Sequence, residues 1–283
     1  MSTALKKTFS FEVEKVSDED FKYFADLVFQ LAGIHLLPNE KNFSLVQNRL
    51  LKLIRKYNFS DYSELAMYYK KEIQNPNVKN DFISALTTNK TDFFREEVHF
   101  EILLSEVKSA LKTRNEVCIW SSACSIGAEP YSMAIHLKEN LSPNEFDRIK
   151  ILATDIDVAC LNSATEGFYN EQQMVGLNPI LRSKYFEELA GLYQVDPKIK
   201  SKVHFSQMNL FNYPYSITKY FDVIFCRNVL IYFTPADREK VCRSLSKYLQ
   251  PTGCLILGLS ETGSVQIPEL KLQSNSTYRR VQS

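Results

Sequence analysis

The stretch Phe221–Phe233, FDVIFCRNVLIYF, decides the fold of this chain. It opens with the apolar run Val223–Phe225, which is long enough only for a buried strand. A strand that is apolar on both faces is typical of a parallel sheet covered by helices. The polar residues Arg227 and Asn228 follow directly, and ligands of open α/β sheets bind at the carboxyl ends of the strands. The stretch therefore predicts both the fold class and the place of a functional site.

Outward from this stretch, strand and helix patterns alternate over the C-terminal part of the chain. Strands are expected at 117–120, 149–154, 203–205, 221–225 and 253–258, and helices at 129–141, 157–166 and 235–249. Such alternation predicts an α/β fold with a Rossmann-like, doubly wound and mostly parallel sheet. Residues 270–273 and 277–281, separated by a Ser-Asn turn, predict an antiparallel C-terminal hairpin on the sheet edge.

Two regions depart from this alternation. Residues 17 to about 85 show only helical periodicity, so we expect an N-terminal all-helical domain over 1–88 and the sheet domain over 89–283. Residues 167–202 contain several Gly and Pro and no long clean period. They predict a small inserted β-subdomain, with a helix around 179–190 and short strands near 191–195.

Composition excludes several classes of protein. The chain has 283 residues and a net charge of +1, which predicts no bulk attraction to nucleic acid. No apolar run has the length of a membrane span, and the N-terminus lacks the apolar core of a signal peptide. The six cysteines form no CxxC pair. We therefore expect a cytoplasmic protein with reduced cysteines, no direct membrane insertion and no metal site.

The first candidate for chemistry is the loop Ser121–Glu129, which joins a strand to a helix. It has one Gly among several small residues, which is too few for a phosphate cradle. Small side chains would still let a flat nucleoside or a short polar chain lie against the backbone. When the loop is taken alone, we favour the alternative, an ordinary tight turn from strand to helix.

Asp155, at the end of the next strand, changes this balance. An acidic side chain in this place can accept hydrogen bonds from both hydroxyls of a ribose. The alternative is that it caps the helix that begins at Asp157. We favour ribose binding, because strand, loop and strand follow in the order of a nucleoside site.

A third candidate is the segment Thr87–Glu96, which lies between the helical region and the sheet, where a cleft would form. Asn89, Thr91 and Arg95 offer hydrogen bonds and a fixed positive charge beside two aromatic side chains. The segment is equally typical of a helix start in which Thr91 is the N-cap and Arg95 lies on the surface. The two interpretations stay open at this point.

Together these segments resemble the chemoreceptor glutamate methyltransferases of bacterial chemotaxis, the CheR family. The matching strings are TTNKTDFFRE at 87–96, IWSSACSIGAEPYS at 119–132, ILATDID at 151–157, FDVIFCRNVLIYF at 221–233 and GLSE at 258–261. They occur in the family's order and at closely similar spacings, and the likeness extends weakly through the N-terminal helices.

The resemblance implies that 89–283 is an S-adenosylmethionine-binding domain with 167–202 inserted in it. It also implies transfer of a methyl group to the γ-carboxylate of glutamates on the cytoplasmic helices of methyl-accepting chemotaxis receptors. The products would be a glutamate methyl ester and S-adenosylhomocysteine, and no metal would take part.

By position, the family's cofactor contacts fall on Asn89, Thr91, Arg95, Glu129, Asp155, Asn209, Leu210, Asn228 and Val229. Arg95 and Tyr232 match the residues next to the transferred methyl group. Arg95 would orient either the substrate carboxylate or the carboxylate of the cofactor. Arg227 receives no role from the resemblance, and we expect it to be structural.

The sequence departs from the family in places. Ala128 stands where an acid is usual, Ala123 where a Gly is common, and Leu259 where a His is frequent. The insert around Gly191 is shorter and less Gly-rich than in members that dock on a receptor's C-terminal pentapeptide, so we expect no tethering to that peptide.

Two further questions stay open from the sequence. The basic face formed by Arg49, Lys52, Arg55 and Lys56 could dock on Glu- and Gln-rich receptor helices or could simply be solvated.

A methyltransferase acting on small molecules or nucleic acid would share the fold. A non-catalytic adaptor that binds S-adenosylmethionine or S-adenosylhomocysteine is a further alternative: Ala128 leaves it open, while Arg95 and Tyr232 favour an enzyme.

Overall fold

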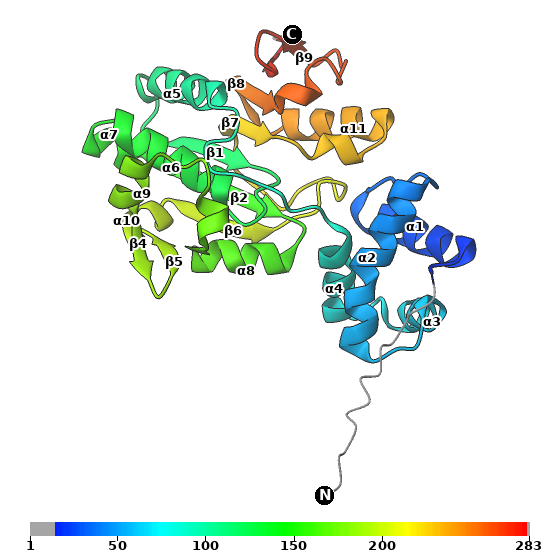
Figure 1. Ribbon diagram of the computed structural model, residues 1–283. Coiled ribbons are helices and arrows are strands. Elements are labelled where there is room, and N and C mark those ends of the chain that lie inside the picture. Colours follow the sequence, from blue (N-terminus) through cyan, green and yellow to red (C-terminus); the bar gives the residue numbers. More distant parts are fainter. Residues whose placement is uncertain (1–14, 282–283) are drawn as a thin grey trace, which may run out of the picture. The chain divides into compact units, whose positions relative to one another are not determined.

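The computed structural model describes residues 15–281, and these divide into two compact units (Figure 1). The first unit contains residues 15–31 and 36–86, and the second contains residues 32–35 and 87–281. The short segment Ala32–His35 thus belongs with the second unit, although in the sequence it lies between helices of the first. Within residues 15–281, no helix is both long and apolar enough to cross a membrane.

The first unit is all-helical, as expected. Its helices are α1 (Asp18–Ala32), α2 (Glu40–Tyr57), α3 (Tyr62–Glu72) and α4 (Pro76–Leu86). Asn39 caps α2 by accepting a hydrogen bond from the backbone N–H of Asn42, and Asp61 caps α3 in the same way from Glu64. Apolar residues at helical spacing fill the core between the helices, among them Phe24, Leu50, Tyr69 and Phe82.

The second unit is built on a seven-stranded sheet with the order β6-β2-β1-β7-β8-β10-β9. Its strands are β1 (Val117–Ser121), β2 (Ile149–Asp155), β6 (Val203–Gln207), β7 (Phe221–Cys226), β8 (Leu249–Leu257), β9 (Leu270–Leu272) and β10 (Thr277–Arg280). The strands from β6 to β8 pair in parallel, whereas β10 is antiparallel to both β8 and β9. These observations confirm the predicted fold class.

Both faces of the sheet are covered, which explains the apolar strands. In β1, Val117 and Ile119 pack into a core with α5 (Val98–Leu111) and α6 (Ala128–Asn140). The alternate residues Cys118 and Trp120 pack into a second core with α11 (Pro235–Ser246). The helices α7 (Pro143–Asp147) and α8 (Val158–Glu166) and the short 3-10 turns η2 (Leu230–Tyr232) and η3 (Leu259–Glu261) complete this part of the unit.

The insert forms a separate three-stranded antiparallel sheet of order β3-β5-β4. It consists of β3 (Phe168–Tyr169), η1 (Glu171–Met174), α9 (Pro179–Tyr185), β4 (Phe186–Leu189), β5 (Leu192–Val195) and α10 (Pro197–Lys200). The helix expected around 179–190 is therefore wrong in its second half. Ala190 and Gly191, both with positive φ, close a tight turn, and pairing of β4 with β5 overrides the helical pattern.

A second correction concerns the segment before α5. The helix begins at Val98, after the N-cap position Glu97, so Thr91 is not its N-cap. The segment 91–97 instead contains Phe94 and Glu96 in left-handed backbone conformations, with φ of 54° and 58°. It runs as an irregular loop into the site described next.

Candidate functional site

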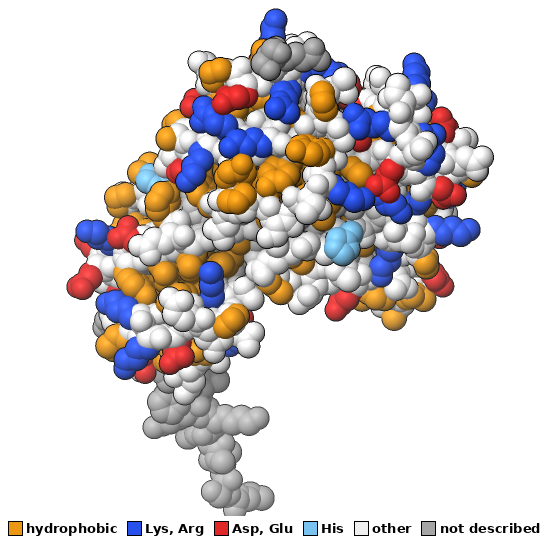
Figure 2. Space-filling view, turned by 180° about the vertical axis from the view of Figure 1, so that it is seen from behind, with side chains coloured by type: hydrophobic (Ala, Val, Ile, Leu, Met, Phe, Trp, Pro, Cys, Tyr) orange, Lys and Arg blue, Asp and Glu red, His pale blue; other side chains and the backbone are white. Residues whose placement is uncertain are grey.

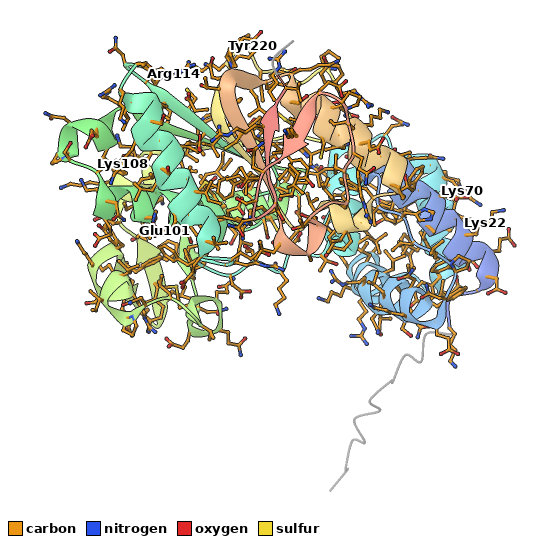
Figure 3. The ribbon with its side chains drawn as sticks, turned by 90° about the horizontal axis from the view of Figure 1, so that it is seen from above. Lys22, Lys70, Glu101, Lys108, Arg114 and Tyr220 are labelled. Carbon is orange, nitrogen blue, oxygen red and sulfur yellow. The ribbon has the colours of Figure 1, made fainter. Side chains whose placement is uncertain are left out.

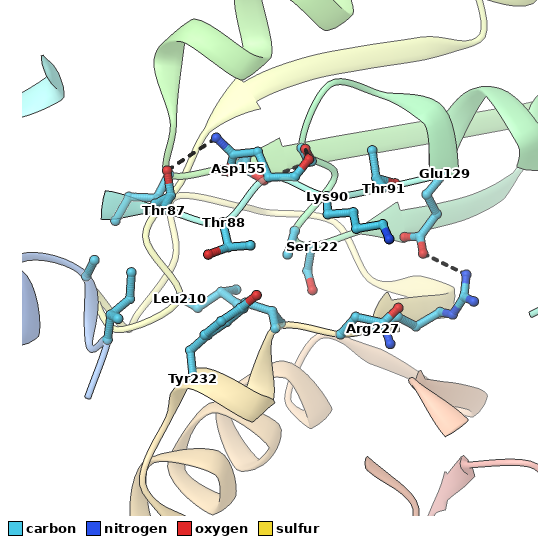
Figure 4. A pocket seen from close by; sticks show the side chains of 18 of the residues that line it. Thr87, Thr88, Lys90, Thr91, Ser122, Glu129, Asp155, Leu210, Arg227 and Tyr232 are labelled. Carbon is cyan, nitrogen blue, oxygen red and sulfur yellow. Dashed lines mark hydrogen bonds and ion pairs between the residues drawn. The ribbon is translucent and has the colours of Figure 1, made fainter. Parts of the chain in front are cut away.

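The strand order reverses at β1, which lies between β2 and β7. Open α/β sheets bind ligands at such a switch point, outside the carboxyl ends of the strands. A pocket lies there, lined by residues at or directly after the ends of β1, β2, β6 and β7, including Ser122, Asp155, Met208 and Arg227 (Figure 4).

The pocket brings together the residues to which the resemblance assigns cofactor or catalytic roles. Its lining includes Asn89, Thr91, Arg95, Glu129, Asp155, Asn209, Leu210, Asn228, Val229 and Tyr232. These residues come from distant parts of the chain. Figure 4 shows Asp155 and Thr91 on one wall and Leu210 and Tyr232 on the opposite one, with the bonded pair Glu129 and Arg227 at one end.

Asp155 is 9% exposed and fixes the loop after β1. Its Oδ2 accepts a hydrogen bond from the backbone N–H of Ser125 at 2.7 Å, and its Oδ1 accepts one from Asp157 at 3.0 Å. A carboxylate has about four acceptor sites, so lone pairs remain for a ligand. Burial raises the pKa of Asp155 to about 6. The helix α8 is capped by Asp157 and not by Asp155, since the Asp157 side chain accepts from the N–H groups of Ala159 and Cys160.

Glu129 stands in the first turn of α6, where the positive end of the helix dipole favours a carboxylate. Its Oε1 accepts a hydrogen bond from Ser121 Oγ at 2.8 Å, and its Oε2 accepts one from Arg227 Nη1 at 2.9 Å. Burial raises the pKa of the Glu129 carboxyl, although the Arg227 charge acts in the opposite direction.

The Arg227 side chain is 1% exposed and binds two carboxylates. Besides Glu129, its Nη2 lies 3.0 Å from Glu96 Oε2. Glu96 and Glu129 thus share the Arg227 guanidinium, and Arg95 Nε lies 3.9 Å from Glu96 Oε1 as a second positive charge.

Arg95 and Tyr232 face the same pocket. The Arg95 side chain is 38% exposed, so its guanidinium can reach an incoming substrate. Figure 4 shows the Tyr232 ring with its hydroxyl directed into the pocket, toward the side on which Thr88 and Ser122 lie. The pocket lining thus carries the cations Lys90, Arg95 and Arg227, the acids Asp92, Glu129 and Asp155, and the Tyr232 hydroxyl.

Asn89 and Asn209 lie in the pocket wall with parts of their side chains already bonded. Asn89 Nδ2 donates a hydrogen bond to Asp157 Oδ2 at 2.7 Å, and the side-chain oxygen Oδ1 of Asn89 can serve as an acceptor. Asn209 Oδ1 accepts from the backbone N–H of Phe211 at 2.9 Å. Leu210 adds a buried apolar side chain to the lining, and its carbonyl accepts from the Tyr215 hydroxyl at 2.8 Å.

Sequence reasoning missed the segment Ala32–His35. Ala32 and Ile34 line the pocket, and the His35 N–H donates to the carbonyl of Tyr232 at 3.0 Å. Gly33, with φ of 69°, lies directly against Phe211, whose ring would meet a Cβ atom at 2.1 Å. The only signal in the sequence is Gly33 itself, and by pattern alone it indicates no more than the end of a helix.

The basic residues expected to dock receptors lie on α2, in the first unit, and not at the pocket. Lys52 and Arg55 are exposed. Arg49 is half-buried and donates to the carbonyl of Ala85 at 3.5 Å. Lys56 Nζ forms an ion pair of 2.5 Å with Asp81 on α4. Of these four side chains, Lys52 and Arg55 are therefore the ones best placed to meet a partner.

The three residues that depart from the family pattern lie in different surroundings. Ala128 is 2% exposed, packs into the core and does not line the pocket. Ala123 lines the pocket as a small residue. The side chain of Leu259 is 42% exposed. Its backbone N–H donates a hydrogen bond to Glu96 Oε2 at 3.0 Å. A change of side chain at 259 leaves this backbone bond available.

The fold and the pocket are those of an α/β protein with a pocket at the switch point of its parallel sheet, and the comparisons with known proteins narrow this class. The family described as CheR methyltransferase, SAM binding domain, matches residues 89–279, and the family described as CheR methyltransferase, all-alpha domain, matches residues 19–87. The chain therefore belongs to the CheR methyltransferase family, which comprises S-adenosylmethionine-dependent methyltransferases of chemotaxis.

Curated relatives agree with this assignment. The chain is 34% identical to a chemotaxis protein methyltransferase of Borreliella burgdorferi over 255 residues, covering 87% of this chain and 89% of the relative. It is 36% identical to the chemotaxis protein methyltransferase of Salmonella typhimurium over 267 residues, covering 93% and 90%. Among solved structures, PKMT2 from Rickettsia typhi in complex with AdoHcy aligns with 50% of this chain and 21% of its own, at 15% identity. Its TM-score of 0.33 is too low to inform the site.

Proposed function

We propose that the chain transfers the methyl group of S-adenosylmethionine to the γ-carboxylate of glutamates on the cytoplasmic helices of chemoreceptors. The products are a glutamate methyl ester and S-adenosylhomocysteine. The observation that carries this proposal is that Arg95 and Tyr232 line the same pocket as Glu129 and Asp155. Arg95 can orient an anion, and Tyr232 can donate a hydrogen bond. They lie beside Asp155, which suits the ribose of a nucleoside, and Glu129, which suits an amino group.

The side chains of the pocket fit the chemistry of S-adenosylmethionine. The remaining lone pairs of Asp155 suit the two hydroxyls of a ribose. Glu129 lines the pocket from the first turn of α6, and its carboxylate suits the ammonium of the methionine part. Ser122, Ala123 and Ser125 are small enough to let a nucleoside approach the backbone.

The glutamate that accepts the methyl group requires little chemical activation. When bound, the cofactor supplies a methyl group on a positively charged sulfur, which is already a good leaving group. A glutamate carboxylate is ionised at neutral pH, so no strong general base is needed. The task of the protein is to place the two reactants in line and exclude water. Arg95 orients the acceptor carboxylate or the cofactor's own carboxylate, and Tyr232 donates a hydrogen bond that aims the attacking oxygen.

Surface charge favours a protein acceptor over nucleic acid. The net charge of +1 predicts no bulk attraction to nucleic acid. On the face shown in Figure 2, basic side chains lie among apolar, acidic and uncharged ones. On α2, Lys52 and Arg55 are exposed and suit the acidic surface of receptor helices. We place receptor docking there and expect no need for a C-terminal pentapeptide, so truncation of that peptide should leave the Michaelis constant of the receptor unchanged.

Incubation with S-adenosylmethionine that carries a tritiated methyl group, together with receptor-containing membranes, tests this function. We expect label on the receptor that mild alkali releases, as a carboxyl methyl ester requires. A receptor whose candidate glutamates are changed to alanine is the control and should stay unlabelled. Cofactor binding without any transfer would contradict the proposal and support the non-catalytic adaptor instead.

A further inference from the structure

The carboxylate of Glu96 joins segments that are distant in the sequence. Its Oε2 accepts hydrogen bonds from Arg227 Nη2 and from the backbone N–H of Leu259, each at 3.0 Å. Its Oε1 accepts one from Asn228 Nδ2 at 3.2 Å. The Glu96 side chain is 15% exposed and does not itself line the pocket. Glu96 thus fastens the loop before α5 to the carboxyl end of β7 and to η3.

Arg95, which does line the pocket, is held through these contacts at two points. Its carbonyl oxygen accepts a hydrogen bond from Arg227 Nη2, the nitrogen that also binds Glu96. Its side-chain Nε lies 3.9 Å from Glu96 Oε1. Phe94 and Glu96 on either side of it have left-handed φ angles of 54° and 58°. Such conformations persist only where surrounding contacts hold them, and Glu96 supplies several of these contacts here.

We propose that Glu96 is a positioning residue for methyl transfer, which holds the Arg95 guanidinium in place at the wall of the pocket. The inference rests on the proposed function, because Glu96 acts only through the part that Arg95 plays there. It assigns a task to an acid that touches neither cofactor nor acceptor.

Glu96→Gln separates this role from simple stabilisation, because it keeps the size of the side chain. The amide oxygen can still accept from Arg227 and Leu259, while the amide of Asn228 turns to accept from the new NH₂ group. The negative charge is lost, and with it the ion pairs of Glu96 with Arg95 and Arg227. We expect kcat at saturating S-adenosylmethionine to fall by about 10- to 100-fold, since a misplacement of about 1 Å has an effect of this size.

Asp222→Asn is the matched control. Asp222 is also buried and bound to an arginine, with its Oδ1 3.1 Å from Arg114 Nε and its Oδ2 accepting from the N–H of Cys118. It stands near the amino end of β7, at the edge of the sheet opposite to the pocket. Figure 3 shows its partner Arg114 beyond the C-terminal end of α5. This variant should lose stability but keep kcat within about twofold, since it leaves the pocket unchanged.

The test measures kcat for receptor labelling in Glu96→Gln, Arg95→Ala and the double variant. If Glu96 acts through Arg95, its substitution changes kcat less than about threefold once Arg95 is already alanine, because the two effects are not additive. An unchanged kcat in Glu96→Gln, or the same fold loss in both backgrounds, overturns the inference and leaves the proposed function standing. Absence of receptor labelling by the wild-type chain overturns the function itself, and the inference with it.

Discussion

Arg227 Nη1 lies 2.9 Å from Glu129 Oε2, in an ion pair whose arginine side chain is 1% exposed. The second terminal nitrogen of the same guanidinium binds Glu96. Taking three charges out of water is costly, and the arrangement is stable only while all of them are present. This pair links the pocket wall at α6 to the end of β7, and it makes Arg227 a central structural residue of the site.

Arg227→Met is expected to destabilise the chain by about 3–5 kcal/mol, because it leaves Glu96 and Glu129 buried without their partner. Urea unfolding measures the loss. Lys219→Met is the control, since Lys219 pairs with Glu116 at 2.8 Å while its side chain is 62% exposed. An exposed pair of this kind contributes about 0–1 kcal/mol. Equal losses in the two variants would contradict the role of the Arg227 pair.

Cofactor affinity should depend on pH through Asp155, whose pKa burial raises to about 6. Below that pH a proton occupies a lone pair that a ribose hydroxyl would otherwise use. We therefore expect the affinity for S-adenosylmethionine to fall as the pH is lowered through 6, by up to about tenfold per pH unit. Calorimetric titrations between about pH 5 and 8 check this, with Asp155→Asn as the variant that should bind weakly and without this pH dependence.

The same shift has the opposite sign for folding stability. The pKa of Asp155 in the folded chain is higher than in the unfolded chain. Between about pH 4 and 6 the folded state therefore holds a proton that the unfolded state has released. Through this group alone, stability rises as the pH falls through 6. In Asp155→Asn this contribution to the pH dependence of urea unfolding should disappear, and its persistence would contradict the raised pKa.

Gly33→Ala should weaken cofactor binding, because a Cβ atom there would meet the Phe211 ring at 2.1 Å and displace the segment that lines the pocket. Gly263→Ala is the control, because Gly263 has a similar φ of 72° and a Cβ atom there would meet nothing within 4 Å. Both variants bear a backbone strain of about 1–2 kcal/mol. Only Gly33→Ala should raise the dissociation constant of S-adenosylmethionine, and an equal effect of both would refute the contribution of Ala32–His35.

Tyr232→Phe is expected to lower kcat by more than about tenfold while changing cofactor affinity less than about twofold, because the lost hydrogen bond acts on the reacting oxygen. Calorimetry and methyl-transfer assays measure the two quantities. Tyr220→Phe is the control, since Tyr220 is 55% exposed and does not line the pocket (Figure 3). Equal loss of binding and turnover would show that the Tyr232 hydroxyl serves the cofactor and not the transfer.

Charge reversal on α2 tests receptor docking. The double variant Lys52→Glu and Arg55→Glu should raise the Michaelis constant for the receptor, and added salt should reduce the difference from wild type by screening. Lys22→Glu with Lys70→Glu reverses as many charges elsewhere in the helical unit, on α1 and α3 (Figure 3). If the Lys52 and Arg55 double variant leaves the Michaelis constant unchanged, or if both double variants raise it equally, the basic face of α2 is an ordinary solvated surface.

Local pattern is sufficient to predict the sheet and the place of the pocket, whereas Asn209, Leu210, Val229 and Tyr232 are assigned only through the family resemblance. The strand at Phe221–Cys226 is apolar on both faces, and Asp155 and Asn228 lie in or directly after strands whose carboxyl ends meet. Parallel strands bring such positions together whatever the intervening sequence. Glu129 is accessible to prediction for a similar reason, since it stands at the start of the helix after β1.

The features that local pattern does not reveal depend on tertiary contacts. Ala32–His35 joins the pocket through a backbone hydrogen bond to Tyr232, which no periodicity reveals. Phe186–Leu189 has a helical pattern but pairs with β5, because cross-strand contacts outweigh local propensity. The shared charge of Glu96, Glu129 and Arg227 likewise arises only when the loop before α5 meets the end of β7.

Locating the transferred methyl group on the receptor tests methyl transfer to glutamate side chains most directly. Receptor is incubated with the chain and S-adenosylmethionine bearing a deuterated methyl group, and its peptides are analysed by mass spectrometry. We predict the label on glutamate side chains, removable by mild alkali, and strongly reduced but still measurable when Arg95→Ala replaces the wild-type chain. Label that resists alkali on another residue type, or cofactor binding with no labelled receptor peptide, would contradict it.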